Sequence, residues 1–205
     1  MDILKKSIVV VACLLSFKSK SQNFDETLKA FKSSYNNEYN SNYKAAISDL
    51  QKVYKADSYE LNLRLGWLYY ASKDNAKSME YYQKAIDLRK YSTEARFGFI
   101  KPANEAKQYS KAYDKYEEIL KIDPYNSVAN YWVGVYYYNA KKYDIAAKYF
   151  ELVVNMNPFD YDSNYMLAWT FLNLGKVNDA KALFQQALFY KPDDAAAKDG
   201  LSKCK

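Results

Sequence analysis

The stretch VGVYYYNAKKYDIAAKYFELVVNMNP, residues 133–158, decides the fold. Its second half sets a small residue, a large aromatic residue and a medium apolar residue at spacings of four and three. Those spacings place Ala146, Phe150 and Val153 on one face of a helix, which the following proline ends. The first half centres on Gly134 and predicts a second helix, so the stretch encodes two helices joined by a short turn.

The same pattern recurs along the chain at a nearly constant period of about 34 residues. The equivalents of the second helix are Ala46-Leu50-Val53-Ser58, Ser78-Tyr82-Ala85-Lys90, Ala112-Tyr116-Ile119-Pro124 and Ala180-Phe184-Ala187-Pro192. Upstream of these helices, Leu65-Gly66 and Leu167-Ala168 align with Val133-Gly134. Five copies in register predict an all-α protein built from stacked helix pairs, because no single pair buries enough apolar surface alone.

These residues resemble the pattern of the tetratricopeptide repeat (TPR) family, with Leu-Gly and Tyr in helix A and Ala, Phe, Ala and Pro in and after helix B. The resemblance covers roughly residues 25–194. It implies a TPR-type right-handed superhelical solenoid of antiparallel helix pairs. We expect an array over residues 22–194 with about five repeats, at 27–58, 59–92, 93–126, 127–160 and 161–194. Residues 195–205 are expected to form a capping helix, Ala195 to about Lys203, and a tail, with Asp193-Asp194 as the helix cap.

Three features depart from the family pattern. Asparagines stand in the place of the family's early tryptophan: Asn62, Asn130 and Asn164. The first copy has Ser33-Ser34 instead of Leu-Gly. In the third copy Gly98 lies two residues early, and Pro102 falls within helix A, where proline kinks a helix or ends it early. We therefore expect an irregular helix pair over residues 92–122.

The composition argues against an enzyme. The 205 residues include 49% hydrophobic and 26% charged residues, but no histidine. A Ser-His-Asp triad, a Cys-His pair and a histidine-ligated zinc site are thereby excluded. Adjacent carboxylates such as Glu117-Glu118 and Asp193-Asp194 do not share a helix face, and no phosphate-binding glycine loop or clustered cysteine motif occurs. We predict no enzymatic activity, no catalytic residue, no cofactor and no metal site.

The N-terminal segment MDILKKSIVVVACLLSFKSKSQ has the layout of a secretory signal peptide. Lys5 and Lys6 precede an apolar run from Ile8 to Phe17, and small residues follow, with cleavage expected after Ser21. The run is shorter than the about 20 residues that span a bilayer, so no membrane span is expected in the mature chain. Residues 1–21 would direct export to the periplasm or to the extracellular side of the envelope. An uncleaved N-terminal anchor is the alternative.

The two cysteines bear on the compartment and on cross-linking. Val10-Val11-Ala12-Cys13 resembles the lipobox of bacterial lipoproteins, so lipidation at Cys13 is a further alternative, although the apolar run continues past it. Cleavage removes four lysines and one aspartate and lowers the formal net charge from +6 to +3, too little to predict nucleic-acid binding. It leaves Cys204 alone. We expect a spectator thiol on a frayed tail, and a cross-link between two chains is the alternative.

The TPR resemblance implies that partners, usually extended peptides or helices, bind along the concave inner face of the A helices. The predicted binding residues at these positions are Tyr35, Leu63, Trp67, Tyr70, Tyr131, Tyr138, Tyr165, Trp169 and Asn173, and Phe31, Val135 and Leu172 share the face. TPR domains that hold chaperone C-termini place lysine, arginine and asparagine there. The corresponding positions of this sequence are mostly aromatic or apolar, so we do not expect that binding mode. Tyrosine and tryptophan are enriched in binding hot spots.

We therefore predict a scaffold or adaptor that binds a protein or peptide partner in an aromatic groove. Two alternatives stay open. The first is an envelope glycan-binding module, since rings stack on sugar faces. The second is a closed groove whose rings only pack against one another. Within the run of three tyrosines, Tyr137 repeats as Tyr69 and belongs to a buried seam, Tyr138 faces the groove, and Tyr136 is expected to meet an adjacent repeat.

Overall fold

The structure is a computed structural model that describes residues 24–205. The predicted signal peptide and the lipobox at Cys13 lie outside the described residues. Within residues 24–205 every regular element is a helix, which confirms the all-α fold class. In this same range, none of the helices combines the length and the apolarity that a membrane span requires.

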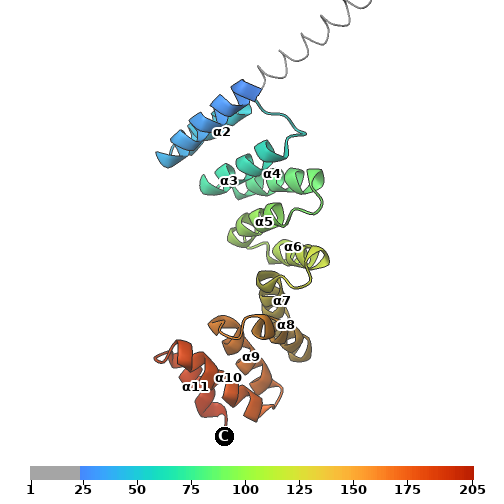
Figure 1. Ribbon diagram of the computed structural model, residues 1–205, viewed down its shortest axis with the longest axis vertical. Helices are drawn as coiled ribbons and strands as arrows, with labels where there is room; N and C mark the ends of the chain where they lie inside the picture. The colour runs from blue at the N-terminus through green and yellow to red at the C-terminus, as the bar shows by residue number, and fades with distance from the viewer. Residues whose placement is uncertain (1–23) are drawn as a thin grey trace, which may run out of the picture. The chain divides into compact units, whose positions relative to one another are not determined.

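The described chain forms two compact units, unit 1 up to Ala106 and unit 2 from Lys107 (Figure 1). Unit 1 contains a helix over residues 24–39, then α2 (Tyr43–Gln51), α3 (Tyr59–Ala71), α4 (Asn75–Leu88) and α5 (Thr93–Glu105). Unit 2 contains α6 (Tyr109–Ile122), α7 (Ser127–Asn139), α8 (Tyr143–Met156), α9 (Tyr161–Asn173), α10 (Val177–Tyr190) and α11 (Ala195–Lys203). Within each unit, consecutive helices pack against one another in chain order.

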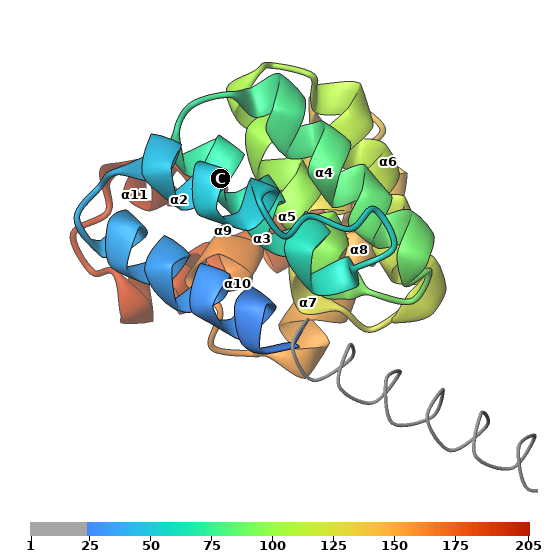
Figure 2. The ribbon, with the colours of Figure 1, turned by 90° about the horizontal axis from the view of Figure 1, so that it is seen from above.

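The first helix pair of unit 1 shows how such a pair is joined. Figure 2 shows residues 24–39 and α2 side by side. The hydroxyl of Ser33 donates to the Asp49 carboxylate at 2.6 Å, and the Asn37 amide donates to the same carboxylate at 2.8 Å. This polar link lies in the copy that has Ser33-Ser34 instead of the apolar Leu-Gly pair.

From α3 onward, the A helices begin at capping residues that recur at the same position of each repeat. In each case the side chain accepts a hydrogen bond from the backbone N–H three residues further on. The caps are Ser58, Ser92, Asn126, Asp160 and Asp194. A cap of this kind stabilises a helix by about 1 kcal/mol. Because Asp194 is part of this series, α11 begins as a further A helix would.

The A helices end in turns that contain a left-handed residue. These residues have φ between 57° and 75°, and they are Ser41, Lys73, Lys107, Lys141 and Gly175. After α3 the Asp74 N–H donates to the Tyr69 carbonyl and the Lys73 N–H to the Tyr70 carbonyl, both at 2.9 Å. This is the Schellman arrangement that satisfies the last carbonyls of a helix. Only Gly175 meets the conformation without a side chain that opposes it.

The asparagines that replace the family's tryptophan fasten the turns before the A helices. Asn62, Asn130 and Asn164 are at most 2% exposed. The Asn130 amide donates to the carbonyls of Pro124 and Asn126, both at 2.9 Å. Asn62 and Asn164 make the equivalent pairs of bonds. Because each amide satisfies two buried carbonyls at once, it closes the turn from inside the protein.

Close approach of helices explains the positions of the helical glycines. A Cβ on Gly66 would lie 2.9 Å from the Tyr82 ring, and one on Gly134 would lie 2.7 Å from Phe150. Gly98 on α5 also approaches the Tyr82 ring, and a Cβ there would meet it at 2.2 Å. Gly98 therefore accommodates the ring of the preceding B helix. This is why its place differs from that of the small residue that meets its own B helix.

Pro102 lies inside α5, where we expected a kink or an early end. The early end is wrong, because α5 continues to Glu105 and has the same 13 residues as α3 and α7. The residue four positions before Pro102, whose carbonyl a proline ring would strike, is Gly98. Its backbone freedom allows that carbonyl to tilt, and Pro102 itself is buried. The following helix, α6, also has the 14 residues of α8.

The C-terminus is ordered, and the prediction of a frayed tail around Cys204 is wrong. Cys204 is 7% exposed and belongs to the core cluster that contains Phe184. Its thiol lies 3.4 Å from the Gly200 carbonyl, and burial raises the pKa of the thiol. A Cβ on Gly200 would meet the Phe184 ring at 2.3 Å, so α11 closes over that ring as α5 closes over Tyr82. A buried thiol of this kind is not available for a cross-link between folded chains.

Candidate functional site

An inner hollow of about 630 Å³ lies in unit 1 between residues 24–39, α3 and α5. Three of the predicted binding residues, Tyr35, Leu63 and Trp67, line it together with Phe31. Tyr35 is 53% exposed, and Leu63 and Trp67 are half-buried. The A-helix register thus brings four apolar or aromatic side chains from two helices onto one open surface.

A half-buried ion pair between Arg64 and Glu38 forms the floor of the inner hollow. Arg64 and the indole N–H of Trp67 both donate hydrogen bonds to the Glu38 carboxylate. Only 10% of the Arg64 side chain is exposed, and its guanidinium lies 3.9 Å from the centre of the Tyr35 ring. Burial raises the pKa of Glu38, but the bonds from Arg64 and Trp67 outweigh it, and the net pKa is lowered. Glu38 therefore stays ionised and fixes both Arg64 and Trp67.

The wall of the inner hollow on α5 carries Phe97 and Lys101. The Lys101 ammonium lies 5.5 Å from the centre of the Trp67 ring, within cation–π range. Lys101 is exposed and makes no ion pair with the described residues 24–205. The sequence analysis missed Arg64, which lies outside the positions carried over from the family. It also missed Phe97 and Lys101, because no position of the third repeat was carried over, although they lie one repeat period after Leu63 and Trp67. A step of one repeat period from Trp67 would have found Lys101.

One end of the inner hollow is acidic, and its carboxylates are engaged. Glu60 pairs with Arg89 at 2.5 Å. Glu94 accepts a hydrogen bond from the Tyr59 hydroxyl at 3.1 Å. Burial and the nearby Glu94 carboxylate raise the pKa of Tyr59, so its hydroxyl remains a donor. The donors Arg64 and Lys101 lie one to two helical turns further along α3 and α5.

Tyr70 lies next to the inner hollow without lining it. Its ring centre is 5.8 Å from that of Trp67 and 5.6 Å from the Lys73 ammonium. Lys73 in turn pairs with Glu105 at 3.1 Å, and this contact lowers the pKa of Glu105. Tyr70 therefore extends the aromatic surface from α3 toward the end of α5.

In unit 2 most of the predicted binding residues pack against the core. Tyr131, Tyr138, Tyr165 and Trp169 all contact the cluster around Phe184 and Phe150. The Trp169 ring meets Phe184 edge-to-face at 5.2 Å, and its buried indole N–H has no hydrogen-bond partner among the described residues. Asn173 is exposed and donates to the Trp169 carbonyl at 2.8 Å and to the Tyr138 hydroxyl at 3.4 Å.

The C-terminal helix covers this part of unit 2. The Lys203 ammonium of α11 lies 5.0 Å from the centre of the Trp169 ring. Lys203 also pairs with Asp199 at 2.5 Å. At α9 and α11 the rings therefore pack against the core and against α11, as the alternative of a groove closed by its own side chains expects. That alternative does not describe the inner hollow of unit 1.

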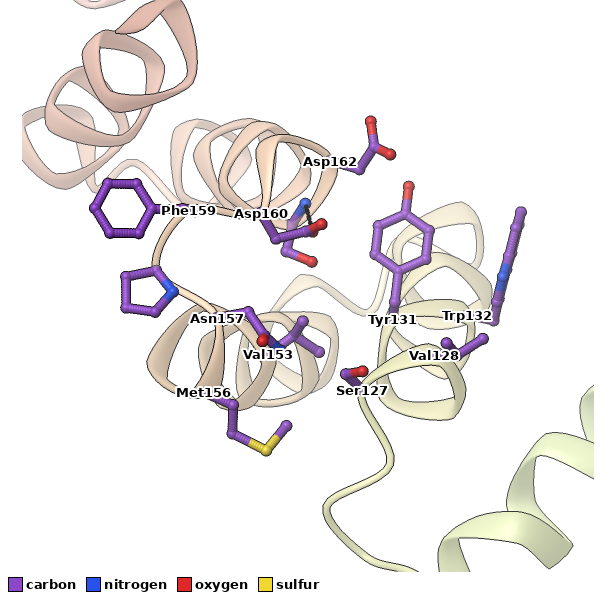
Figure 3. Close-up of a pocket in the computed structure, with 12 residues that line it drawn as sticks. Ser127, Val128, Tyr131, Trp132, Val153, Met156, Asn157, Phe159, Asp160 and Asp162 are labelled. Carbon is purple, nitrogen blue, oxygen red and sulfur yellow. Dashed lines mark hydrogen bonds between the residues drawn. The ribbon is translucent and has the colours of Figure 1, made fainter. Parts of the chain in front are cut away.

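Tyr131 lines a second hollow, the end hollow, of about 790 Å³. Figure 3 shows it between the start of α7, the end of α8 and the start of α9, with the Tyr131 ring beside Asp160 and Asp162. Burial, followed by the charges of Asp162 and Asp160, raises the pKa of Tyr131 to about 12. Trp132 and Phe159 also line this hollow and were not among the predicted binding residues.

The three tyrosines of α7 contact different neighbours. The Tyr136 ring stacks on Tyr113 of α6, with ring centres 3.8 Å apart, so Tyr136 meets an adjacent repeat as predicted. Tyr137 is half-buried, stacks on Tyr149 at 5.7 Å and accepts a hydrogen bond from Tyr113 at 3.2 Å. Burial, followed by the contacts with Tyr137 and Glu117, raises the pKa of Tyr113. These rings hold α6, α7 and α8 together.

The described residues 24–205 contain no cluster of three or more Asp, Glu or Cys side chains placed to hold a metal ion. The inner hollow offers instead aromatic rings, an aliphatic side chain and hydrogen-bond donors on rigid helices. Such a surface suits the capture of a side chain or a short chain segment.

Comparison with known proteins agrees with the repeat architecture. Family models described as tetratricopeptide repeat match residues 38–95 and 137–204. Together the two segments make up more than half of the sequence. The chain therefore belongs to the tetratricopeptide repeat family, whose members bind peptide or protein partners. Among curated proteins, none matches the chain significantly.

Several solved structures share the fold at low sequence identity. MamA is 20% identical over 83% of this chain and 94% of its own, with a TM-score of 0.69. A tetratricopeptide repeat protein from Parabacteroides merdae ATCC 43184 is 16% identical over 88% of this chain and 72% of its own, with a TM-score of 0.74. YrrB, described as a TPR protein with an unusual peptide-binding site, is 14% identical over 91% and 97%, with a TM-score of 0.71. At these identities the likeness establishes the fold alone.

Proposed function

We propose that this protein is an adaptor whose inner hollow in unit 1 binds a segment of another protein. One observation carries the proposal: Tyr35, Leu63 and Trp67, which the repeat register selects as binding positions, line one open hollow. Exposed aromatic surface of this kind marks contact surfaces, and Trp and Tyr supply contact area at low entropic cost. The peptide-binding site described for YrrB is consistent with such a use of the fold.

The rigidity of the hollow also supports binding. Glu38 fixes both Arg64 and Trp67 before any partner arrives. A partner segment would therefore not have to order these side chains on binding. Ordering a long side chain at an interface costs about 0.5–1.5 kcal/mol, so this arrangement favours affinity.

A peptide selection tests the proposal. The full chain is used to select binders from a displayed library of random peptides, and affinities of the selected peptides are measured by fluorescence anisotropy. Trp67→Ala and Tyr35→Ala should each weaken binding by about tenfold or more, in the range of hot-spot truncations. Tyr39→Ala is the matched control, because Tyr39 lies on the same helix as Tyr35, is 90% exposed and does not line the hollow; it should leave the affinity unchanged.

Circular dichroism of each variant shows whether the helices are retained. Tyr35 is more than half exposed, so Tyr35→Ala should fold even if Trp67→Ala does not. Binding that survives Tyr35→Ala and a folded Trp67→Ala would overturn the proposal, and so would a failure to select any peptide. The glycan-binding alternative finds no support among the similar structures, and envelope glycans serve as a second probe in the same assay.

We also propose that the chain is exported, on the strength of the leader pattern in residues 1–21. The test is the mass of the protein recovered from its host. A mature chain that begins at Gln22 is the expected result. An intact Met1 terminus or a lipid-modified Cys13 would each replace this proposal with one of the alternatives given by the sequence.

A further inference from the structure

Two lysines at the same repeat position stand over two tryptophans at the same repeat position. Trp67 and Trp169 lie three repeat periods apart, and so do Lys101 and Lys203. In each unit the ammonium of the lysine lies over the ring of the tryptophan on the preceding A helix, at 5.5 Å in unit 1 and 5.0 Å in unit 2. The two sites are therefore built on one plan.

They differ in what neutralises the lysine. In unit 2, Asp199 on the same helix pairs with Lys203 at 2.5 Å. The residue of unit 1 at the position of Asp199 is Phe97, which lines the inner hollow. Lys101 makes no ion pair within residues 24–205. Unit 1 thus has an apolar wall where unit 2 has a carboxylate.

Among the other charged groups of the inner hollow, the carboxylates already have partners, whereas a hydrogen-bond donor does not. Glu60 and Glu94 already have Arg89 and Tyr59 as partners. Glu38 takes a terminal nitrogen of Arg64, while the buried Nε of Arg64 has no partner among the described residues. The unmet polar groups of the hollow are therefore donors, which a carboxylate satisfies best.

We infer that the partner segment supplies the missing carboxylate. It carries an Asp or Glu side chain that pairs with Lys101, beside an apolar residue that packs on Trp67, Leu63 and Phe97. This inference rests on the proposed function, because it names the chemistry of the partner that the inner hollow takes. In effect, the partner does for Lys101 what Asp199 does for Lys203.

Matched peptides test the inference. A selected peptide is made in two forms that differ only in Glu or Gln at one position, both with amidated C-termini so that no terminal carboxylate is present. The Glu form should bind the full chain about fivefold more tightly at low salt, and the preference should shrink as ionic strength rises. Equal affinities for every such pair would overturn the inference.

Variants locate the charge. Lys101→Gln should abolish the preference for Glu, whereas Lys203→Gln, the register-matched control, should leave it intact. Lys101→Glu should reverse it, so that a Lys form of the peptide binds better than the Glu form. Phe97→Asp should remove the preference by giving Lys101 an internal partner, while Phe97→Asn, which changes the shape in the same way, should keep it.

The outcome separates this inference from the proposed function. If Trp67→Ala and Tyr35→Ala abolish binding but Lys101→Gln leaves the Glu preference unchanged, the hollow binds peptides and the inference is wrong. A preference for Glu that persists in Phe97→Asp contradicts it as well. If no peptide binds the hollow at all, the proposed function itself has failed.

Discussion

Trp67 in unit 1 and Trp169 in unit 2 occupy the same place in the repeat, yet their surroundings differ. Trp67 lines an open hollow, and its indole N–H bonds to Glu38. Trp169 packs on Phe184, and its buried N–H has no partner among the described residues. The repeat position alone therefore does not decide whether a ring binds or packs.

The residues that make the difference lie close to the ring in each case. The position of Glu38 is taken in unit 2 by Tyr138, and that of Arg64 by Met166. These replacements remove the charge pair from the floor of the second site. A single repeat pattern can thus yield a polar, open surface or a packed seam, according to two or three neighbouring side chains.

The largest expected effect separates the two tryptophans by stability. Trp169→Ala should lower the free energy of unfolding by about 2–4 kcal/mol, because it leaves a cavity against Phe184. Trp67→Ala should cost less stability, because one side of that ring already faces an open hollow, and should act mainly on binding. Urea unfolding followed by circular dichroism measures both. Equal losses of stability would break the comparison.

Glu38→Gln should lower the stability of unit 1 by about 1–2 kcal/mol at neutral pH, because Arg64 and Trp67 lose a charged acceptor. The pKa of Glu38 is lowered on folding, so its contribution is present above its ordinary value of 4.5 and is lost as the pH falls through the folded value. The variant and the parent should therefore converge in stability on acidification. Fluorescence of Trp67, with Trp132 and Trp169 changed to phenylalanine, reports on unit 1. A constant difference down to acidic pH would contradict the assignment.

A smaller effect concerns the two indole N–H groups. Trp67→Phe should cost about 1 kcal/mol, since Glu38 loses one donor. Trp169→Phe loses no hydrogen bond, because its N–H already lacks a partner among the described residues, and its cost comes only from the cavity that the smaller ring leaves against Phe184. Thermal unfolding of the two variants gives the difference. The loss for Trp67→Phe should shrink in the Glu38→Gln background, whereas that for Trp169→Phe should not change; a loss for Trp67→Phe that is the same in both backgrounds would contradict the hydrogen bond to Glu38.

The smallest pair of effects lies in the turns. Gly175→Ala in unit 2 should cost about 0.5–1 kcal/mol, because φ is +75° there although nothing lies within 4 Å of the added Cβ. Ser41→Gly in unit 1, where φ is 58°, should stabilise by a similar amount, reduced by the entropy that glycine adds to the unfolded chain. Opposite signs for the two changes in urea unfolding are the expected result. The same sign for both would mean that these turns do not keep their conformation in solution.

The period of the apolar pattern predicted most of the fold. Ala146, Phe150 and their equivalents fix the helix faces, so the helix pairs, the register and the helix at Ala195–Lys203 could be read from spacing. The continuation of α5 through Pro102 could not, because it depends on Gly98 lying four residues earlier and on the burial of Pro102. The order at Cys204 depends on contacts with a core that is distant in sequence.

The candidate site was only partly predictable for a similar reason. The repeat register placed Tyr35, Leu63 and Trp67 on one face, but it also predicted Trp169 as a binding residue. The donors Arg64 and Lys101 become part of a site only when three A helices are brought together. A comparison of each position with its equivalents in the other repeats carries part of this information, as the exchange of Asp199 for Phe97 shows.

The glycine at position 200 has a consequence for the lifetime of the protein. It lets α11 lie so close to Phe184 that the ring is entirely hidden from solvent. A protease cut or a premature stop codon ahead of Asp194 would remove α11 and expose the Phe184 ring at the end of the repeat array. Chains truncated in this way should aggregate, so α11 maintains the solubility of the protein as well as completing the fold.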